Sequence, residues 1–176
     1  MAIYTKKGDR GETGLFNGKR LLKDSLLIEA IGAIDEANSA WGVVGSHTEN
    51  GRTKELINKI QSDLFTIGSI LAGAKLSFPF SKTKYLEKEI DKLEDALPVL
   101  ANFILPGGSK PACFFHLARS TTRRAERRLV ALLNPSAVPS TLLPFINRLS
   151  DFAFCLARKE NFDSKVKEWI IEKKFY

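Results

Sequence analysis

The sequence predicts an all-α protein, specifically a five-helix antiparallel bundle with a ferritin-like up-and-down arrangement. Apolar residues recur at steps of three and four in five separate stretches, which is the spacing of amphipathic helices. No stretch alternates between apolar and polar residues for long enough to predict a sheet. The 176 residues, 44% hydrophobic and 27% charged, are typical of one folded domain covering residues 1–176.

The N-terminal arm, residues 1–20, has too many glycines to be helical. Glycines at every third residue let backbone N–H groups turn toward a common point, as in loops that bind phosphate. No Gly-Lys-Ser/Thr follows at the Walker A spacing. A flexible Gly- and Lys-rich N-terminal arm is therefore the plainer interpretation, and phosphate binding stays open beside it. The residues that would serve phosphate are Thr5, Lys6, Lys7, Gly8, Arg10, Gly11, Thr13, Gly14 and Lys23.

The first three helices are expected at about 24–46, 53–74 and 82–97. Each carries one apolar stripe, which predicts the face that packs into a shared core. The stripe of the first helix passes through Leu27, Ile31, Ile34, Asn38, Trp41 and Gly45.

The fourth helix, about 109–134, is unusually rich in arginine. At about 100° per residue, one face beside the apolar stripe collects His116, Arg119, Arg123, Glu126 and Arg127. Arg124 and Arg128 are predicted to point further round, toward solvent. Clustered guanidinium groups repel one another unless anions lie between them, and they bind phosphate or carboxylate oxygens well. The face therefore indicates anion binding, although a solvated face with Glu126 paired to a neighbour would also explain it.

His116 alone does not indicate catalysis, because a single histidine on a helix face is more often a hydrogen-bonded structural residue. The sequence has no Glu-x-x-His pair of the kind that holds two metal ions in helical bundles. No protein metal site is therefore predicted.

An apolar loop at 98–108 ends in Pro-Gly-Gly, and its part from Phe103 to Gly108 could line a flat hydrophobic pocket. A linker at 134–141 leads into the fifth helix, about 139–160.

The fifth helix places Asn147 and Asp151 on one face, with Arg148 close by. A capping and salt-bridge cluster is the plain interpretation of these three. The charged tail, 161–176, contains Trp169 and two isoleucines and is predicted to dock as a short helix.

The net charge of +7 favours anionic partners, which could be a nucleotide, a nucleic acid or an acidic membrane surface. The two cysteines, Cys113 and Cys155, form no metal motif and are expected to be reduced, as in a cytoplasmic protein. The start of the chain has no apolar segment that would indicate export. Prolines interrupt the longest uncharged run, 129–147, so no membrane span is expected.

Taken together, these motifs resemble the PduO-type ATP:cob(I)alamin adenosyltransferases. The stretches that match, in the family's order, are IYTKKGDRGETG, EAIGAIDEANSAWG, FILPGGS, HLARSTTRRAERR and FINRLSDFAFCLAR. They span residue 3 to about 158, and the combination of RRAERR with NRLSD is highly specific. The tail after residue 160 lies outside the resemblance.

The resemblance implies a bundle that assembles as a homotrimer, with active sites between adjacent subunits. Asp35 would pair with Arg119 across the subunit boundary, and Phe103 would lie beneath the corrin ring. Catalysis would depend on Arg123, Lys23 and Asn147. The ATP-binding residues would be Thr5, Lys6, Lys7, Gly8, Thr13, Gly14, Lys23, Arg123, Arg124, Glu126, Arg127 and Asn147.

In the implied reaction, the cobalt of cob(I)alamin attacks the ribose C5′ of ATP and expels triphosphate. No proton leaves the nucleophile, so no protein base is needed. Lys23, Arg123 and a Mg²⁺ held mainly by the ATP phosphates would stabilise the leaving group. Phe103 would keep the cobalt four-coordinate, which makes its reduction by a partner reductase easier.

Two alternatives belong to other classes. A basic helical module that binds nucleic acid would explain the arginines, but not the N-terminal glycines or the apolar loop. Nucleic acid is therefore not an expected partner. A corrinoid carrier that has lost turnover would bind both substrates and release no triphosphate, and the intact RRAER motif with Asn147 argues against it.

Overall fold

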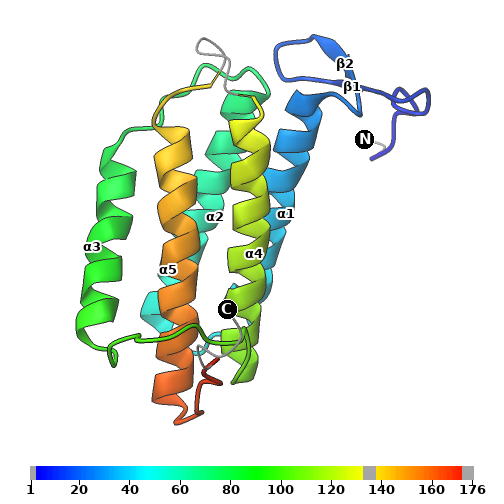
Figure 1. Cartoon of the computed structure of the whole chain (residues 1–176). Helices are drawn as coiled ribbons and strands as arrows, with labels where there is room; N and C mark the ends of the chain where they lie inside the picture. The colour runs from blue at the N-terminus through cyan, green and yellow to red at the C-terminus, as the bar shows by residue number, and fades with distance from the viewer. Residues whose placement is uncertain (1–2, 133–137, 172–176) are drawn as a thin grey trace.

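The computed structural model describes residues 3–132 and 138–171. Within these ranges it contains five helices and one two-stranded sheet (Figure 1). The helices are α1 (Leu26–Ser46), α2 (Gly51–Leu71), α3 (Ser81–Asp95), α4 (Lys110–Val130) and α5 (Leu142–Asp163). Consecutive helices run in opposite directions, so the predicted five-helix antiparallel bundle is confirmed.

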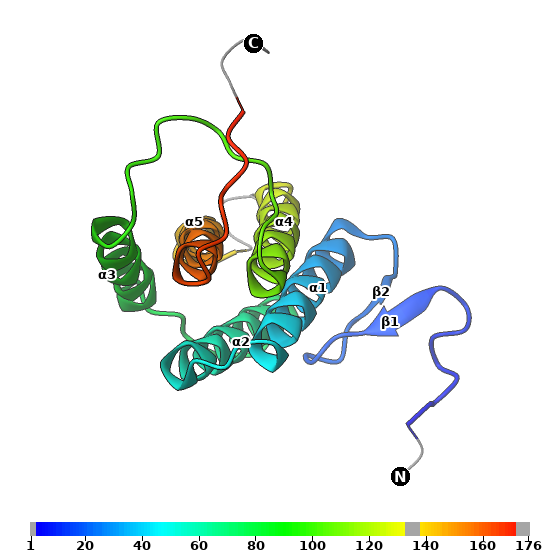
Figure 2. The ribbon, with the colours of Figure 1, turned by 90° about the horizontal axis from the view of Figure 1, so that it is seen from below.

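The helices pack in a fixed order around the centre of the bundle. α4 lies between α5 and α1, α2 packs on the outer side of α1, and α3 packs against α5 (Figure 2). This order leaves α3, α5 and α4 as the walls of one side of the molecule, and α1 with α2 as the other side. No helix of the described residues is long and apolar enough to cross a membrane.

Aromatic residues fill the centre of the core, where the apolar stripes meet as predicted. The ring of Trp41 is stacked on Phe152 at 6.5 Å between centroids and meets Phe115 edge-on at 6.1 Å. Its indole N–H donates a hydrogen bond of 3.2 Å to the hydroxyl of Thr122 on α4. The buried polar group is therefore satisfied, and α1 is fixed to α4 in one register.

The N-terminal arm contains a hairpin that the sequence did not predict. β1 (Glu12–Gly14) pairs antiparallel with β2 (Arg20–Leu22). The turn between them closes through Gly18, whose φ of 82° suits glycine. Strands of three residues are too short for an alternating pattern to be recognised, which is why periodicity missed them.

The prediction that the tail docks as a short helix is wrong for residues 164–171; residues 172–176 lie outside the described residues. After α5 the chain runs extended, and Ile170 forms an antiparallel bridge with Ile104 of the apolar loop. Backbone groups of the tail, which a helix would pair with one another, form hydrogen bonds with that loop instead. The tail is therefore held by partners some sixty residues earlier in the chain, which local pattern cannot reveal.

Candidate active site

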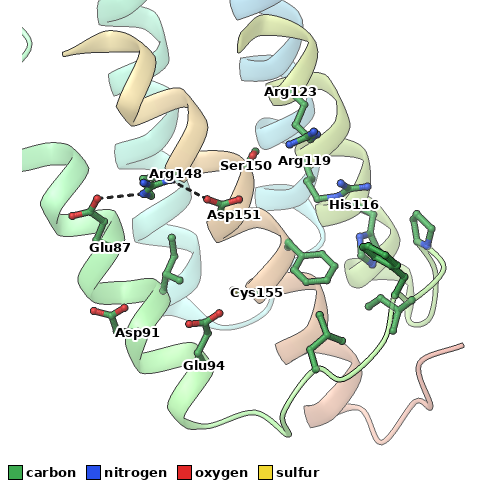
Figure 3. A pocket seen from close by; sticks show the side chains of 16 residues that line it. Glu87, Asp91, Glu94, His116, Arg119, Arg123, Arg148, Ser150, Asp151 and Cys155 are labelled. Atoms are coloured by element: carbon green, nitrogen blue, oxygen red, sulfur yellow. Dashed lines mark hydrogen bonds and ion pairs between the residues drawn. The ribbon is translucent and has the colours of Figure 1, made fainter. Parts of the chain in front are cut away.

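A cavity of about 610 Å³ opens between α3, α4, α5 and the apolar loop (Figure 3). Its walls differ in chemistry: α4 contributes cations, α3 contributes carboxylates, and the loop contributes apolar groups. Charged and apolar side chains that line the cavity include Glu87, Asp91, Glu94, Phe103, His116, Arg119, Arg123, Arg148, Asp151, Phe154 and Cys155.

The α4 wall presents Arg119 and Arg123, two residues of the predicted anion-binding face. Burial and the neighbouring charge of Arg123 lower the pKa of the Arg119 guanidinium. The Nε of Arg119 is buried without a hydrogen-bond partner among the described residues. This wall therefore still has a guanidinium N–H that can donate a hydrogen bond to an anion, as the spacing predicted.

His116 lies one turn before Arg119 and is only 5% exposed. Burial, and then the charge of Arg119, lower its pKa to about 4, so the imidazole is neutral at physiological pH. Neither ring nitrogen has a hydrogen-bond partner among the described residues. The expectation of a hydrogen-bonded structural histidine is therefore wrong for the single chain, because His116 lines the cavity without such a partner. The ring of Phe154 lies nearby, 6.1 Å between ring centroids.

The opposite wall is acidic. Glu87, Asp91 and Glu94 come from α3, and Asp151 comes from α5. Arg148 bridges two of these carboxylates, with 3.2 Å to Glu87 and 3.4 Å to Asp151. Sequence reasoning missed the three α3 residues, because the polar face of an amphipathic helix is normally solvated and carries no other signal.

The floor of the cavity is apolar. Phe103 lines it from the loop with a 69% exposed side chain, and Phe154 lines it from α5. Cys155 lies beside them, and burial together with the charge of Glu94 raises the pKa of its thiol to about 11. A flat apolar surface next to guanidinium groups suits a ligand that combines a macrocycle with an anion.

Asn147 and Glu126, two residues of the predicted ATP site, are in direct contact. The amide of Asn147 donates a 2.7 Å hydrogen bond to the Glu126 carboxylate and accepts one of 2.5 Å from Arg148. The predicted cluster on α5 is thus linked to the arginine helix. The orientation of Asn147 is fixed from both sides.

Arg124 and Arg128 are exposed, as predicted, and each also reaches a carboxylate on the neighbouring helix. Arg124 forms an ion pair with Glu36, and Arg128 forms one of 3.4 Å with Glu29, both on α1. The packing of α1 on α4 aligns these residues, a fact that the sequence of one helix cannot contain. Arg123 and Arg127 are exposed as well, and neither forms an ion pair with the other described residues.

The predicted phosphate-binding residues of the arm lie around the hairpin. The ammonium of Lys23 lies against Gly8, where an added Cβ would be 3.3 Å from its Nζ. Arg20 ties the arm together by donating 2.8 Å to the Lys7 carbonyl and 3.0 Å to Glu12. Gly8 therefore lets a cation approach the backbone closely, in a segment whose Thr5 and Lys6 are exposed.

A second cavity, of about 450 Å³, lies between the hairpin, α1 and α2. Thr13, Gly14 and Asp35 line it, and it shares no residue with the first cavity. Asp35 and Arg119 therefore face different cavities within one chain. The structure does not bring the arm residues and the arginine helix together in one chain.

The chain belongs to the cobalamin adenosyltransferase family. The family model of that description, "Cobalamin adenosyltransferase", matches residues 3–160, as the motifs predicted.

Individual relatives agree with this assignment. A corrinoid adenosyltransferase of Bacillus subtilis is 44% identical over 170 residues, which cover 92% of this chain and 87% of the relative. Corrinoid adenosyltransferase PduO of Citrobacter freundii is 40% identical over 93% of this chain, which spans only 51% of that longer protein. Among solved structures, a variant PduO-type ATP:corrinoid adenosyltransferase from Lactobacillus reuteri, complexed with cobalamin and ATP, superposes with a TM-score of 0.91. It is 35% identical, and the match covers 98% of this chain and 97% of that one.

Proposed function

We propose that this protein transfers the 5′-deoxyadenosyl group of ATP to the cobalt of cob(I)alamin, releasing adenosylcobalamin and triphosphate. The observation that carries the proposal is the composition of the first cavity. An apolar floor with Phe103 adjoins a wall with Arg119 and Arg123, so one cavity suits a corrin ring and a polyphosphate together.

The reaction needs charge stabilisation rather than proton transfer. The electron pair of Co(I) forms the Co–C5′ bond while the C5′–O bond breaks and triphosphate departs with the bonding electrons. Arg123 and Lys23 would stabilise that developing charge, because fixed cations at a leaving group lower the transition state. Asn147, held by Glu126 and Arg148, would orient the nucleotide.

Phe103 would act on the other substrate. An apolar ring beneath the corrin excludes a lower axial ligand from the cobalt. Removing that ligand favours Co(I), since axial ligation is the main protein lever on the potential of such metals. The reducing electron would come from a separate reductase.

The nucleotide side requires two chains. Lys23 with Thr5, Lys6, Lys7, Gly8, Thr13 and Gly14 would bind ATP from one subunit, and the α4 residues Arg123, Arg124, Glu126 and Arg127 would bind it from the next. Within one chain, Thr13 and Gly14 line the second cavity and Arg123 lines the first, and this separation supports a homotrimer with sites between subunits. Asp35 of one subunit would pair with Arg119 of its neighbour.

Magnesium would arrive with ATP and be held mainly by its phosphate oxygens, while this chain supplies the cations around them. The redox state of both cysteines and the substrates suit the cytoplasm.

A corrinoid carrier is the second candidate, because cavity shape alone would serve binding without turnover. The exposed guanidinium of Arg123, which has no ion pair among the described residues, favours the transferase, since a carrier has no leaving group to stabilise. A nucleic-acid module is disfavoured because Arg124 and Arg128 are occupied by α1 carboxylates.

The deciding experiment is an anaerobic turnover assay with purified protein, ATP, Mg²⁺ and chemically reduced cob(I)alamin. ATP-dependent loss of the Co(I) absorption band with formation of light-sensitive adenosylcobalamin would support the proposal. Binding of both substrates without turnover would favour the carrier. Binding of neither would return attention to the arginine helix and nucleic acid.

A further inference from the structure

The apolar loop that carries Phe103 is fastened by hydrogen bonds from the end of α5 and from the tail. The family match ends at residue 160, whereas the groups that fasten the loop extend to residue 171. Figure 2 shows the tail crossing directly over the loop before α4 begins.

Asn161 is the first fastening group. It is fully buried, and its side-chain oxygen accepts a 2.8 Å hydrogen bond from the backbone N–H of Ser109. Its amide nitrogen donates a 3.0 Å bond to the carbonyl of Gly107. Between them, Gly108 has a φ of 116° and room for no side chain, because a Cβ there would collide with the Asn161 amide. One side chain therefore fixes the end of the loop where α4 starts.

The tail is the second fastening group. The N–H of Leu105 donates 2.9 Å to the carbonyl of Trp169, and the N–H of Ile171 donates 2.8 Å to the carbonyl of Phe103. These two bonds flank the bridge between Ile104 and Ile170. The backbone of Phe103 itself is thus held as part of a short antiparallel ladder.

Arg158 joins the two fastenings. It is 8% exposed, and it donates 2.8 Å to the carbonyl of Pro98, near the start of the loop. Its Nε lies 3.3 Å from the carboxylate of Glu168 in the tail. The loop is therefore attached at its beginning, middle and end to groups that follow residue 157.

We infer that Asn161 and the tail segment 168–171 are positioning elements for Phe103 in the reduction of the corrinoid. The inference rests on the proposed function, in which Phe103 displaces the lower ligand of cob(II)alamin before an external donor supplies one electron. An apolar ring can displace a ligand only if the backbone that carries the ring stays in place. Asn161 and Ile171 hold that backbone in place through hydrogen bonds on either side of the loop.

Two variants loosen the loop from independent sides. Asn161→Ala removes both bonds to the loop end, and Ile171→Pro removes the N–H that binds the Phe103 carbonyl. Ile171→Ala is the matched control, because it changes the side chain and keeps that donor. With cob(II)alamin and ATP bound, electron paramagnetic resonance measures the four-coordinate fraction.

We expect both loosening variants to reduce the four-coordinate fraction, and the rate from cob(II)alamin with a chemical one-electron donor, by about tenfold. Turnover from cob(I)alamin that has been reduced beforehand should stay within about twofold of the unmodified protein, because the ring is then no longer needed to displace a ligand. Ile171→Ala should resemble the unmodified protein in both assays.

A pH-dependent rescue separates positioning from general damage. In Asn161→Asp, an ionised carboxylate still accepts from Ser109 but repels the Gly107 carbonyl, whereas a protonated carboxyl can donate to it. The four-coordinate fraction of this variant should therefore be low while the introduced carboxyl is ionised and recover once the pH is low enough to protonate it, with the unmodified protein scanned over the same pH range as the control.

The outcomes are distinct. Folded variants that keep the full four-coordinate fraction would overturn the positioning role. Equal losses in both turnover assays would also overturn it, since they would indicate a general defect. If the unmodified protein fails to convert cob(I)alamin at all, the proposed function itself is wrong.

Discussion

The two cavities differ in how completely one chain builds them. The walls of the first cavity include buried, fixed groups such as His116 and Cys155, and its loop is tied to α5. The second is bordered by the hairpin, whose arm residues Thr5 and Lys6 are exposed and which Arg20 holds together. The first cavity is therefore formed by packed helices and a tied loop of one chain, whereas the second is bordered by an exposed arm; in the proposed homotrimer a neighbouring subunit would complete the nucleotide side.

The contrast is sharpest at the cations that would share ATP. Arg123 lines the first cavity, and Lys23 lies against Gly8 of the arm. The proposed homotrimer would bring both cations to one nucleotide from different chains. Variants on either side test that division.

Arg123→Ala should lower the rate of adenosylcobalamin formation from cob(I)alamin by about 100- to 1000-fold, because it removes a cation from the leaving triphosphate. The decay of the Co(I) absorption band under saturating ATP measures the rate. Arg52→Ala is the control, since the Arg52 side chain is 76% exposed and its ion pair among the described residues is with Glu89. A near-normal rate in the Arg123 variant would remove that residue from the site.

Mixing two inactive variants should restore part of the activity. In oligomers reassembled from equal amounts of Lys23→Ala and Arg123→Ala chains, about a quarter of the interfaces would combine an intact arm with an intact α4. Turnover should recover to about that fraction of the unmodified rate. If the mixture stays inactive after exchange has been verified, the division between chains is wrong.

His116 should make stability depend on pH. Its pKa is lowered to about 4 in the fold, so the unfolded chain binds more protons between pH 6.5 and 4. Stability is therefore complete above pH 6.5 and falls as the pH decreases through that window, by about 2 kcal/mol at pH 5. Urea unfolding at pH 7 and 5 should show a smaller difference for His116→Gln. Parallel losses in both proteins would contradict the assignment.

Phe103→Ala should slow conversion that starts from cob(II)alamin by about tenfold and leave the KM for ATP unchanged, since the ring belongs to the corrinoid side. Leu105→Ala, a change in the same loop, serves as the control. Loss of ATP binding in the Phe103 variant would mean that the loop also serves the nucleotide.

Asp35→Asn has the smallest expected effect, because an ion pair at a subunit boundary contributes modestly. Dissociation of the oligomer should become about fivefold easier by sedimentation at low protein concentration. Asp24→Asn, also exposed and near the start of α1, should change nothing. Unchanged sedimentation together with unchanged kinetics in the Asp35 variant would refute its pairing with Arg119.

Sequence pattern predicted the bundle well because its core is built from stripes. Residues such as Trp41 and Leu129 are buried at the spacing that one helix alone displays, so no tertiary information was needed to find them. The pairing of Asn147 with Glu126 was also within reach, since both residues belong to motifs of the family.

What the sequence did not predict depends on contacts between distant elements. Arg124 and Arg128 find carboxylates only when α1 packs on α4. Asp91 and Glu94 line a cavity only because α3 lies against α5 across from the arginine helix. The tail became extended because its hydrogen bonds go to the loop, a choice that no local propensity encodes.

The raised pKa of Cys155 has a chemical consequence for a protein that handles such a reactive metal. At pH 7 a thiol with a pKa of about 11 is ionised in only about one molecule in ten thousand. A thiolate in this cavity would compete with Co(I) for the C5′ carbon of ATP, leaving a dead thioether, or would ligate oxidised cobalt. Burial of Cys155 thus keeps its sulfur protonated, which would remove one competitor of cobalt for the C5′ carbon and guard this side chain against alkylation by ATP.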